Sequence, residues 1–412
     1  MTTMDPQPTI DWATDFDILD PRYVEDPASV WAELRNDCPI ARTERWGPTL
    51  LPVRYADIAA IAHDVEHFSS RDIAVVTPGR LHNPHATTML EAPPITSDPP
   101  IHGWARRLLL PAFGPTAIET QTHITRAIAD DLINGFAERG HADIATDYAQ
   151  HIPVRVIAQM LGVPVADEAT FTRWAVTILQ EGFTNLDKAI GSVMELIDYF
   201  RRRTEERRAL PVDRRPDDLL TLLICATDDE DRPLEERHVI GSCFLLLLAG
   251  IDTTWSAIGS GLWHLATHPD DQRRLREDRS LLDSAVEEVL RFYSPVTMAR
   301  YVADEVEVAG CPMQRGDKVL MNFPGGNRDP EMFERPDEFV IDRDRNRHFA
   351  FGSGIHRCLG SNLARMELRV AMERFLDRVP FFELTEDAAV TWSAGQVRGP
   401  RRVPVRWRPL TA

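Results

Sequence analysis

The segment His348–Arg369 reads HFAFGSGIHRCLGSNLARMELR and places one cysteine, Cys358, between a glycine-containing loop and a helix. The helix is predicted to begin near Leu359, because apolar residues recur from there at helical spacing. A sulfur at the N-terminus of a helix faces unpaired backbone N–H groups and the positive end of the helix dipole. Both favour the thiolate over the thiol, so Cys358 is predicted to be a metal ligand or a nucleophile.

A lone cysteine is more often an inert buried residue than a reactive one. The glycines Gly352 and Gly354 favour the reactive interpretation here. They permit a tight turn and the close approach of a flat ligand that a side chain would block.

The order FGSGIHRCLG at residues 351–360 resembles the haem-binding signature of the cytochrome P450 family. This resemblance implies a mainly α-helical fold with small β-sheets, in which helices surround a buried haem b. It implies that Cys358 is the axial ligand of the haem iron, with Phe351, Gly352 and Gly360 in the loop that holds the cofactor. A glycine after the ligand also leaves backbone N–H groups able to bond the sulfur.

Composition limits the function further. The formal net charge of -18 argues against nucleic-acid binding and against adhesion to anionic membranes. The five cysteines form no CxxC pair, and the polar N-terminal segment has no apolar core of a signal peptide, so we expect a cytoplasmic protein. No linker marks a boundary in the 412 residues, so we expect residues 1–412 to be one haem-thiolate monooxygenase domain without a fused reductase. We also expect a monomer.

Hydrophobic periodicity predicts mostly helices. The predicted helices are 28–36, 118–140, 148–161, 168–181, 188–208, 217–226, 281–292 and a long one from 235 onward. Strand patterns at 49–53, 301–308 and 318–321 predict a small sheet, and further short strands are expected near 382, 390 and 403. The proline-rich stretch 71–100 is predicted to be a lid or binding loop, with a disordered insertion as the alternative.

The long helix is apolar on nearly every side until it reaches Asp252 and Thr253. Asp252 has two interpretations: a carboxylate satisfied by a partner such as an arginine, or a group with a chemical role. Thr253 can bond the carbonyl of Ala249, and Gly250 adds no side chain, so the helix groove is expected to widen there. The run 249–254, AGIDTT, resembles the oxygen-activating helix of the same family. There an acid and an alcohol deliver protons to dioxygen, which implies catalytic roles for Asp252 and Thr253.

Glu288 and Arg291 stand three residues apart on one face of a predicted helix. Taken alone, they predict a surface ion pair that contributes little. They resemble the buried Glu-x-x-Arg pair of the family, whose third member is matched by Arg343. The resemblance implies a structural role for these three residues.

The haem propionates need cationic or hydrogen-bonding partners. The resemblance places these partners at His102, Arg106, Arg300 and His356, with His348 as a weaker candidate. Taken one at a time, such residues are more often surface charges.

The resemblance implies a monooxygenase that uses dioxygen, two electrons and two protons to hydroxylate or O-dealkylate its substrate. The electrons are expected from a separate ferredoxin and its NAD(P)H-dependent reductase, docked near Arg107, Arg357 and Arg365. The combination of AGIDTTWSAIG with GQVRGPR is also similar to haem domains of self-sufficient bacterial members that oxidise thiocarbamates and aromatic ethers.

A small apolar or aromatic substrate is predicted, because the expected pocket walls are apolar. These walls are Val75, Val76, Phe183, Leu248, Ala249, Val296 and Val397. Two alternatives remain open. One is a peroxygenase driven by hydrogen peroxide, against which the acid and alcohol pair argues, and the other is a haem sensor or carrier without turnover.

Overall fold

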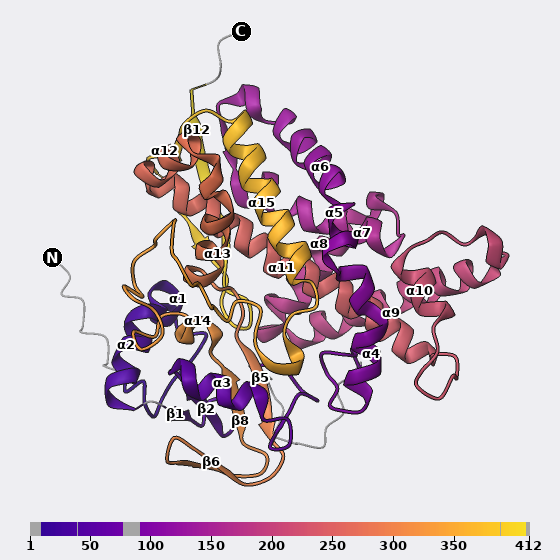
Figure 1. The fold of residues 1–412 in the computed structure, drawn as a ribbon, viewed down its shortest axis with the longest axis horizontal. Helices are drawn as coiled ribbons and strands as arrows, with labels where there is room; N and C mark the ends of the chain where they lie inside the picture. Colours follow the sequence, from indigo (N-terminus) through magenta and orange to yellow (C-terminus); the bar gives the residue numbers. More distant parts are fainter. Residues whose placement is uncertain (1–9, 39, 77–90, 388, 409–412) are drawn as a thin grey trace.

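The computed structural model describes residues 10–38, 40–76, 91–387 and 389–408, together with the backbone but not the side chain of Phe183. The chain is mainly helical with small sheets, as expected (Figure 1). The N-terminal helices and their strands lie together at the lower left of Figure 1, and the longer helices fill the upper and right-hand parts.

The helices of the described residues vary from single turns to one very long element. In chain order they are α1 (Pro21–Glu25), α2 (Pro27–Asp37), α3 (Tyr55–His63), α4 (Ile101–Leu109), α5 (Pro115–Glu119), α6 (Thr122–Asn134), α7 (His151–Leu161), α8 (Glu168–Leu179), α9 (Leu186–Ala209), α10 (Leu219–Cys225), α11 (Glu236–Thr267), α12 (Pro269–Glu277), α13 (Leu282–Phe292), α14 (Phe323–Gly326) and α15 (Ser361–Arg378).

The strands are short and form four small sheets. They are β1 (Ile40–Thr43), β2 (Thr49–Pro52), β3 (Phe68–Ser69), β4 (His141–Asp143), β5 (Met298–Val302), β6 (Val306–Val308), β7 (Cys311–Met313), β8 (Lys318–Met321), β9 (Phe382–Leu384), β10 (Thr391–Trp392), β11 (Pro400–Arg402) and β12 (Pro404–Trp407). The largest sheet has the order β1-β2-β8-β5-β3, with β2 and β8 parallel and its other pairs antiparallel. The other sheets are β4-β12-β9, β10-β11 and β6-β7.

Helix α11 forms the centre of the core. It packs against α7, α15, α8 and α9, and Leu247 and Ile251 meet Leu363 of α15 in one apolar cluster. It is long and apolar enough to cross a membrane, but 72% of its most apolar window is buried inside the protein. This is the pattern of a helix apolar on nearly every side in the middle of a large fold.

The predicted Glu288–Arg291 pair is buried, so the interpretation as a surface pair is wrong. Both side chains are 0% exposed, and two parallel hydrogen bonds of 2.8 Å join the guanidinium to the carboxylate. Arg343 donates to the same carboxylate from 3.0 Å, and the backbone N–H of Val340 and the amide of Asn346 complete its bonds. This network connects α13 to the segment that leads into the Cys358 loop.

Three predicted elements differ from the observed ones. The predicted helix 118–140 is interrupted after α5, where the Thr120 hydroxyl donates to the Ala117 carbonyl and competes with the helical backbone bonds. The predicted strand 301–308 is divided into β5 and β6 by a bend at residues 303–304. The helix expected from Leu359 begins at Ser361.

Replacing Glu288 by Gln is expected to lower the free energy of unfolding by about 3–5 kcal/mol, because two arginines would keep buried charges without a carboxylate. Urea-induced unfolding followed by circular dichroism measures this change. Glu334→Gln alters an exposed carboxylate of the same region and serves as the control. Equal unfolding midpoints for the two variants would contradict a structural role of the network.

Glu367 predicts a pH dependence of stability. Burial raises its pKa from 4.5 to about 8, so between these values the folded chain holds a proton that the unfolded chain has released. The free energy of unfolding is expected to fall by about 1.4 kcal/mol per pH unit across that window, and the contribution is fully present below it. Glu367→Gln removes this slope, which unfolding at several pH values measures. A difference between the two proteins that does not change with pH would refute the prediction.

Candidate haem site

The Cys358 loop is held in shape by its glycines and by one backbone bond. Gly352 and Gly354 have φ angles of +66° and +69°, and a Cβ on Gly354 would lie 2.2 Å from the carbonyl oxygen of Ala62. The Cys358 N–H donates to the Phe351 carbonyl at 2.7 Å. This bond keeps residues 351–358 in a loop, so α15 begins at Ser361 and not near Leu359 as predicted.

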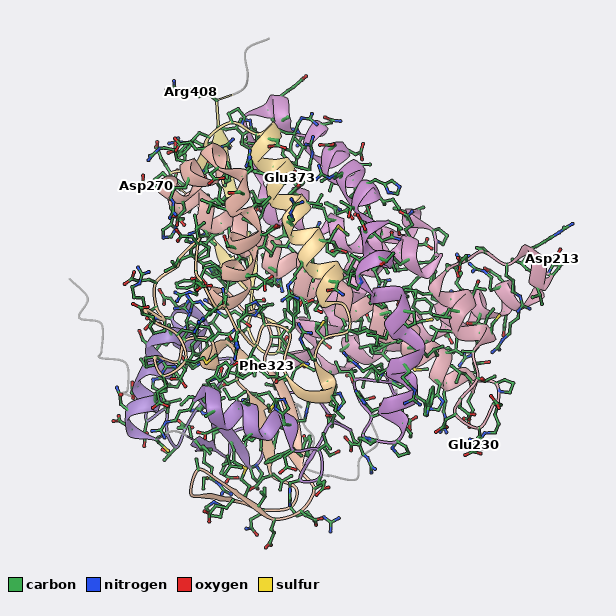
Figure 2. All side chains as sticks on the ribbon, viewed as in Figure 1. Asp213, Glu230, Asp270, Phe323, Glu373 and Arg408 are labelled. Atoms are coloured by element: carbon green, nitrogen blue, oxygen red, sulfur yellow. The ribbon has the colours of Figure 1, made fainter. Side chains whose placement is uncertain are left out.

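Phenylalanine rings support the loop from the side of the N-terminal sheet. Figure 2 shows Phe323 near the centre of the molecule, between α3 and the start of α15. Its ring lies 6.0 Å from that of Phe349, and a Cβ on Gly352 would lie 3.5 Å from it. The glycine loop therefore rests on an aromatic wall.

Cys358 itself is exposed at the end of this loop. Desolvation by the surrounding protein raises the pKa of the Cys358 thiol even though the residue keeps exposed surface, and the backbone of Gly360 and the guanidinium of Arg106 act to lower it. The backbone at the helix start therefore favours the thiolate, as expected, and desolvation opposes it. A bound metal cation reverses this balance, because a coordinating thiol is deprotonated outright.

The predicted propionate partners come together from three distant segments. His102 and Arg106 lie on α4, Arg300 on β5 and His356 in the Cys358 loop, and the rings of His102 and His356 are 4.4 Å apart. Among the described residues, no carboxylate forms an ion pair with any of the four, and the buried Nε2 atom of His102 has no hydrogen-bond partner. Four basic groups with few acidic neighbours form a site for anions.

Two of these basic groups, His356 and Arg300, have lowered pKa values. Burial, together with Arg300, His102 and Arg106, lowers the pKa of His356 to about 2. Burial lowers the pKa of Arg300 to about 10, and Asp98 opposes this only in part. The residues present therefore fit a group that carries two carboxylates, as haem b does.

Asp252 is fully buried on α11, and its partners come from elsewhere in the chain. Its Oδ1 atom accepts a hydrogen bond of 2.7 Å from the Arg401 guanidinium and one of 2.9 Å from the Gln180 amide. Its Oδ2 atom has no partner among the described residues. Burial raises the pKa of Asp252, while Arg401 and Gln180 act to lower it. Both interpretations of Asp252 are compatible with this arrangement. Arg401 binds Oδ1, as a structural partner would, and Oδ2 remains available for a chemical role.

Thr253 lies next to an opening in the core. Its hydroxyl donates to the Ala249 carbonyl at 2.8 Å, as predicted, and α11 is assigned as one continuous helix through this point. The widening of the groove stays a prediction. Ala249 is exposed and Gly250 and Thr253 are half-buried, in the middle of an otherwise buried helix. No hydrogen bond joins Thr253 to Asp252 in the described part of the chain, so transfer between them needs a bridging water.

The predicted pocket walls fall into different surroundings. Val75 and Val76 are buried in an apolar cluster with N-terminal residues, and Leu248 is buried in the central cluster. Val296 and Val397 lie side by side in an isolated β-bridge, whereas the side chain of Phe183 lies outside the described residues. The pocket assignment stays a prediction.

Two other candidates have structural partners instead. His348 bonds Glu287 at 3.1 Å, and Arg365 bonds the same carboxylate at 2.6 Å. Burial acts to raise the pKa of Glu287, but these two partners outweigh it and lower the pKa to about 2. His348 is therefore engaged away from the propionate cluster, and Arg365 is less available to a redox partner. Arg107 and Arg357 are exposed near the Cys358 loop, as the docking prediction requires.

Gln180 and Arg401 are the site residues that sequence reasoning missed. Arg401 lies 149 positions from Asp252, and its run of arginines near the C-terminus has no spacing that indicates a carboxylate partner. The sequence contained one indication of these two residues: a buried acid such as Asp252 needs a polar partner.

The sequence profile of the family described as Cytochrome P450 matches residues 168–390 of the chain. The chain belongs to the cytochrome P450 family. It is 34% identical over 414 residues to the vitamin D(3) 25-hydroxylase of Pseudonocardia autotrophica, covering 96% of this chain and 97% of that protein. It is 32% identical over 405 residues to the P450 monooxygenase PikC of Streptomyces venezuelae, covering 96% and 94% of the two proteins.

Solved P450 structures share the fold along nearly the whole chain. CYP109E1 from Bacillus megaterium, in complex with testosterone, superposes with a TM-score of 0.85 at 31% identity, covering 93% of this chain and 98% of that one. The myxobacterial CYP267B1, in complex with myristic acid, also has a TM-score of 0.85, at 34% identity, covering 95% and 98%. The chain is therefore a cytochrome P450 monooxygenase, and P450 enzymes use haem b.

Cys358→Ser is expected to abolish the far-red-shifted Soret band of the reduced P450 under carbon monoxide, because that band requires a thiolate ligand. Difference spectra of the holoprotein measure it. Cys225→Ser changes another exposed cysteine and should leave the band unchanged. An unshifted band in the parent protein, or a shifted one in Cys358→Ser, would refute the assignment of the ligand.

Proposed function

We propose that this P450 hydroxylates or O-dealkylates an apolar substrate, with Cys358 as the iron ligand and Asp252 and Thr253 as its proton-handling groups. The observation that carries the proposal is the group of four basic side chains beside the exposed Cys358, since it suits the propionates of a haem bound there. Haem b bound through a thiolate supplies the activation of dioxygen. The chain supplies position, protons and exclusion of water.

The proposed role in proton handling rests on the different surroundings of the two oxygens of the Asp252 carboxylate. Arg401 and Gln180 hold Oδ1, so the side chain stays on the core side of α11. Oδ2 has no partner, and burial makes this carboxyl easier to protonate than an exposed one. Thr253, at the opening beside Ala249, receives the proton through water and presents it to the substrate side.

An apolar substrate follows from the apolar side chains predicted around the opening. A small aromatic molecule, such as an alkoxybenzene, is the substrate class that the sequence favours. The named relatives instead act on vitamin D(3) or bind testosterone or myristic acid, so larger apolar molecules belong in the same panel. Binding is measured by the spectral change when substrate displaces water from the iron. A panel in which only charged polar compounds bind would contradict the proposal.

Residues 1–412 act as one haem domain in this proposal, in the cytoplasm and as a monomer. Bacterial P450 enzymes typically receive electrons from separate ferredoxin and reductase proteins. The exposed guanidinium groups of Arg107 and Arg357 suit the acidic surface of such a ferredoxin. Reconstituted turnover should require both added proteins, and unchanged turnover with NADPH alone would refute this requirement.

Thr253→Val is expected to divert reducing equivalents into hydrogen peroxide and to lower product formation by about tenfold or more, since it removes the hydroxyl at nearly constant volume. Asp252→Asn is expected to slow oxygen consumption. Product and peroxide per NADPH are measured in the reconstituted system. Thr253→Ser keeps the hydroxyl and should retain most of the coupling. Equal coupling in Thr253→Val and the parent enzyme would remove Thr253 from the proton route.

A further inference from the structure

A cavity of about 300 Å³ lies between the N-terminal helices α1 and α2 and the chain that follows α13. None of the predicted haem partners contributes to its lining. Its walls are unusually aromatic, with six rings from five parts of the chain. These rings belong to Tyr23, Trp31, Trp263, Phe292, Tyr293 and Trp392.

The rings at this cavity pack edge to face and not in a parallel stack. Trp263 stands nearly perpendicular to Trp392, with ring centroids 5.1 Å apart and an interplanar angle of 88°. It is also nearly perpendicular to Tyr293, at 5.7 Å and 82°. Walls at right angles offer both faces and edges to a planar ring, which are the two favourable contacts between aromatic groups.

The buried charged groups at the cavity are two arginines, Arg398 and Arg328. Arg328 is paired with Asp337 at 3.1 Å, and the exposed carboxylate of Asp26 acts electrostatically on Arg398. The Arg398 guanidinium lies 4.4 Å from the centroid of the Trp392 ring and donates two hydrogen bonds to the Val24 carbonyl, but it forms no ion pair with a carboxylate of the described residues. Arg328 also contributes to the lining. Its Nε atom and the hydroxyl of the buried Ser294 have no hydrogen-bond partner in the described structure.

The acidic groups at this cavity are exposed. Glu25 and Asp26 belong to the lining residues but are open to solvent, and Asp26 already accepts hydrogen bonds from Ser29 at the start of α2. A buried guanidinium without a carboxylate is costly unless another anion compensates it. The arginines already occupy cation–π positions on Trp392 and Phe292, so a cationic ligand does not suit the cavity.

The cavity is separated from the predicted substrate pocket by a thin wall. Pro295, Thr297 and Arg398 contribute to its lining. Val296 and Val397, which alternate with them along the chain, form the β-bridge and do not line it. Neighbouring residues of extended segments point to opposite faces, so ligands could occupy both sides of this wall at once.

We propose that this aromatic cavity is a second binding site, distinct from the haem pocket, for a small planar aromatic carboxylate. The ring of the ligand lies against Trp263 and Trp392, and its carboxylate accepts hydrogen bonds from Arg398. The proposal is independent of the substrate class proposed above.

Binding is tested with 2-naphthoate on the holoenzyme while ketoconazole, which is too bulky for this cavity, occupies the haem pocket. Isothermal titration calorimetry is expected to show one 2-naphthoate per chain. The neutral 2-naphthamide should bind at least about tenfold more weakly, because it lacks the charge that the guanidinium recognises. Equal affinity of the two compounds, or no saturable binding up to about 1 mM, would overturn the proposal.

Two variants locate the bound molecule. Arg398→Gln is expected to weaken 2-naphthoate binding by about tenfold or more. Ala28→Phe places a ring into the cavity and should abolish binding, whereas Glu33→Phe adds the same ring to an exposed position of α2 and should not. Circular dichroism and the carbon monoxide spectrum verify folding. If Arg398→Gln does not fold, the Ala28→Phe and Glu33→Phe pair decides. Unchanged binding in Ala28→Phe would refute the site.

Discussion

The buried carboxylate of Glu288 holds in place the segment that leads to the Cys358 loop. It joins Arg291 on its own helix to Arg343 and to the backbone of Val340. Arg291 continues the network to the carbonyls of Asn327 and Pro336. An ion cluster without access to water holds its members only in a specific geometry, because any rearrangement leaves an uncompensated charge. The irregular chain between α14 and the Cys358 loop is therefore fixed without regular secondary structure.

The segment held by Glu288 leads into the Cys358 loop, and this loop lies in a second unusual electrostatic environment. His102, Arg106, Arg300 and His356 gather there in a protein whose formal net charge is -18. Desolvated positive charge without a carboxylate is unfavourable in the chain alone. The family's cofactor brings two carboxylates, so haem b and the folded protein are expected to stabilise each other.

Helix α11 separates two kinds of chemistry on its opposite sides. Asp252 is directed into the core, where Arg401 and Gln180 bind one of its oxygens. Ala249 and Thr253 lie at an opening on the other side. A proton donor held away from the reacting centre can be recharged without admitting bulk water to the substrate, which suits an enzyme that must exclude side reactions.

The sequence predicts most helices through apolar periodicity, because that pattern is local. The family and the expected iron ligand, Cys358, follow from the resemblance of residues 351–360 to the haem-binding signature. The sequence also indicated that Asp252 needed a partner. The identity of that partner follows from the fold, since Arg401 contacts Asp252 from 149 positions further along the chain. Tertiary contacts likewise engaged His348 with Glu287, buried Glu288 and raised the pKa of the Cys358 thiol. Burial and long-range charge arise from folding, so no local pattern encodes them.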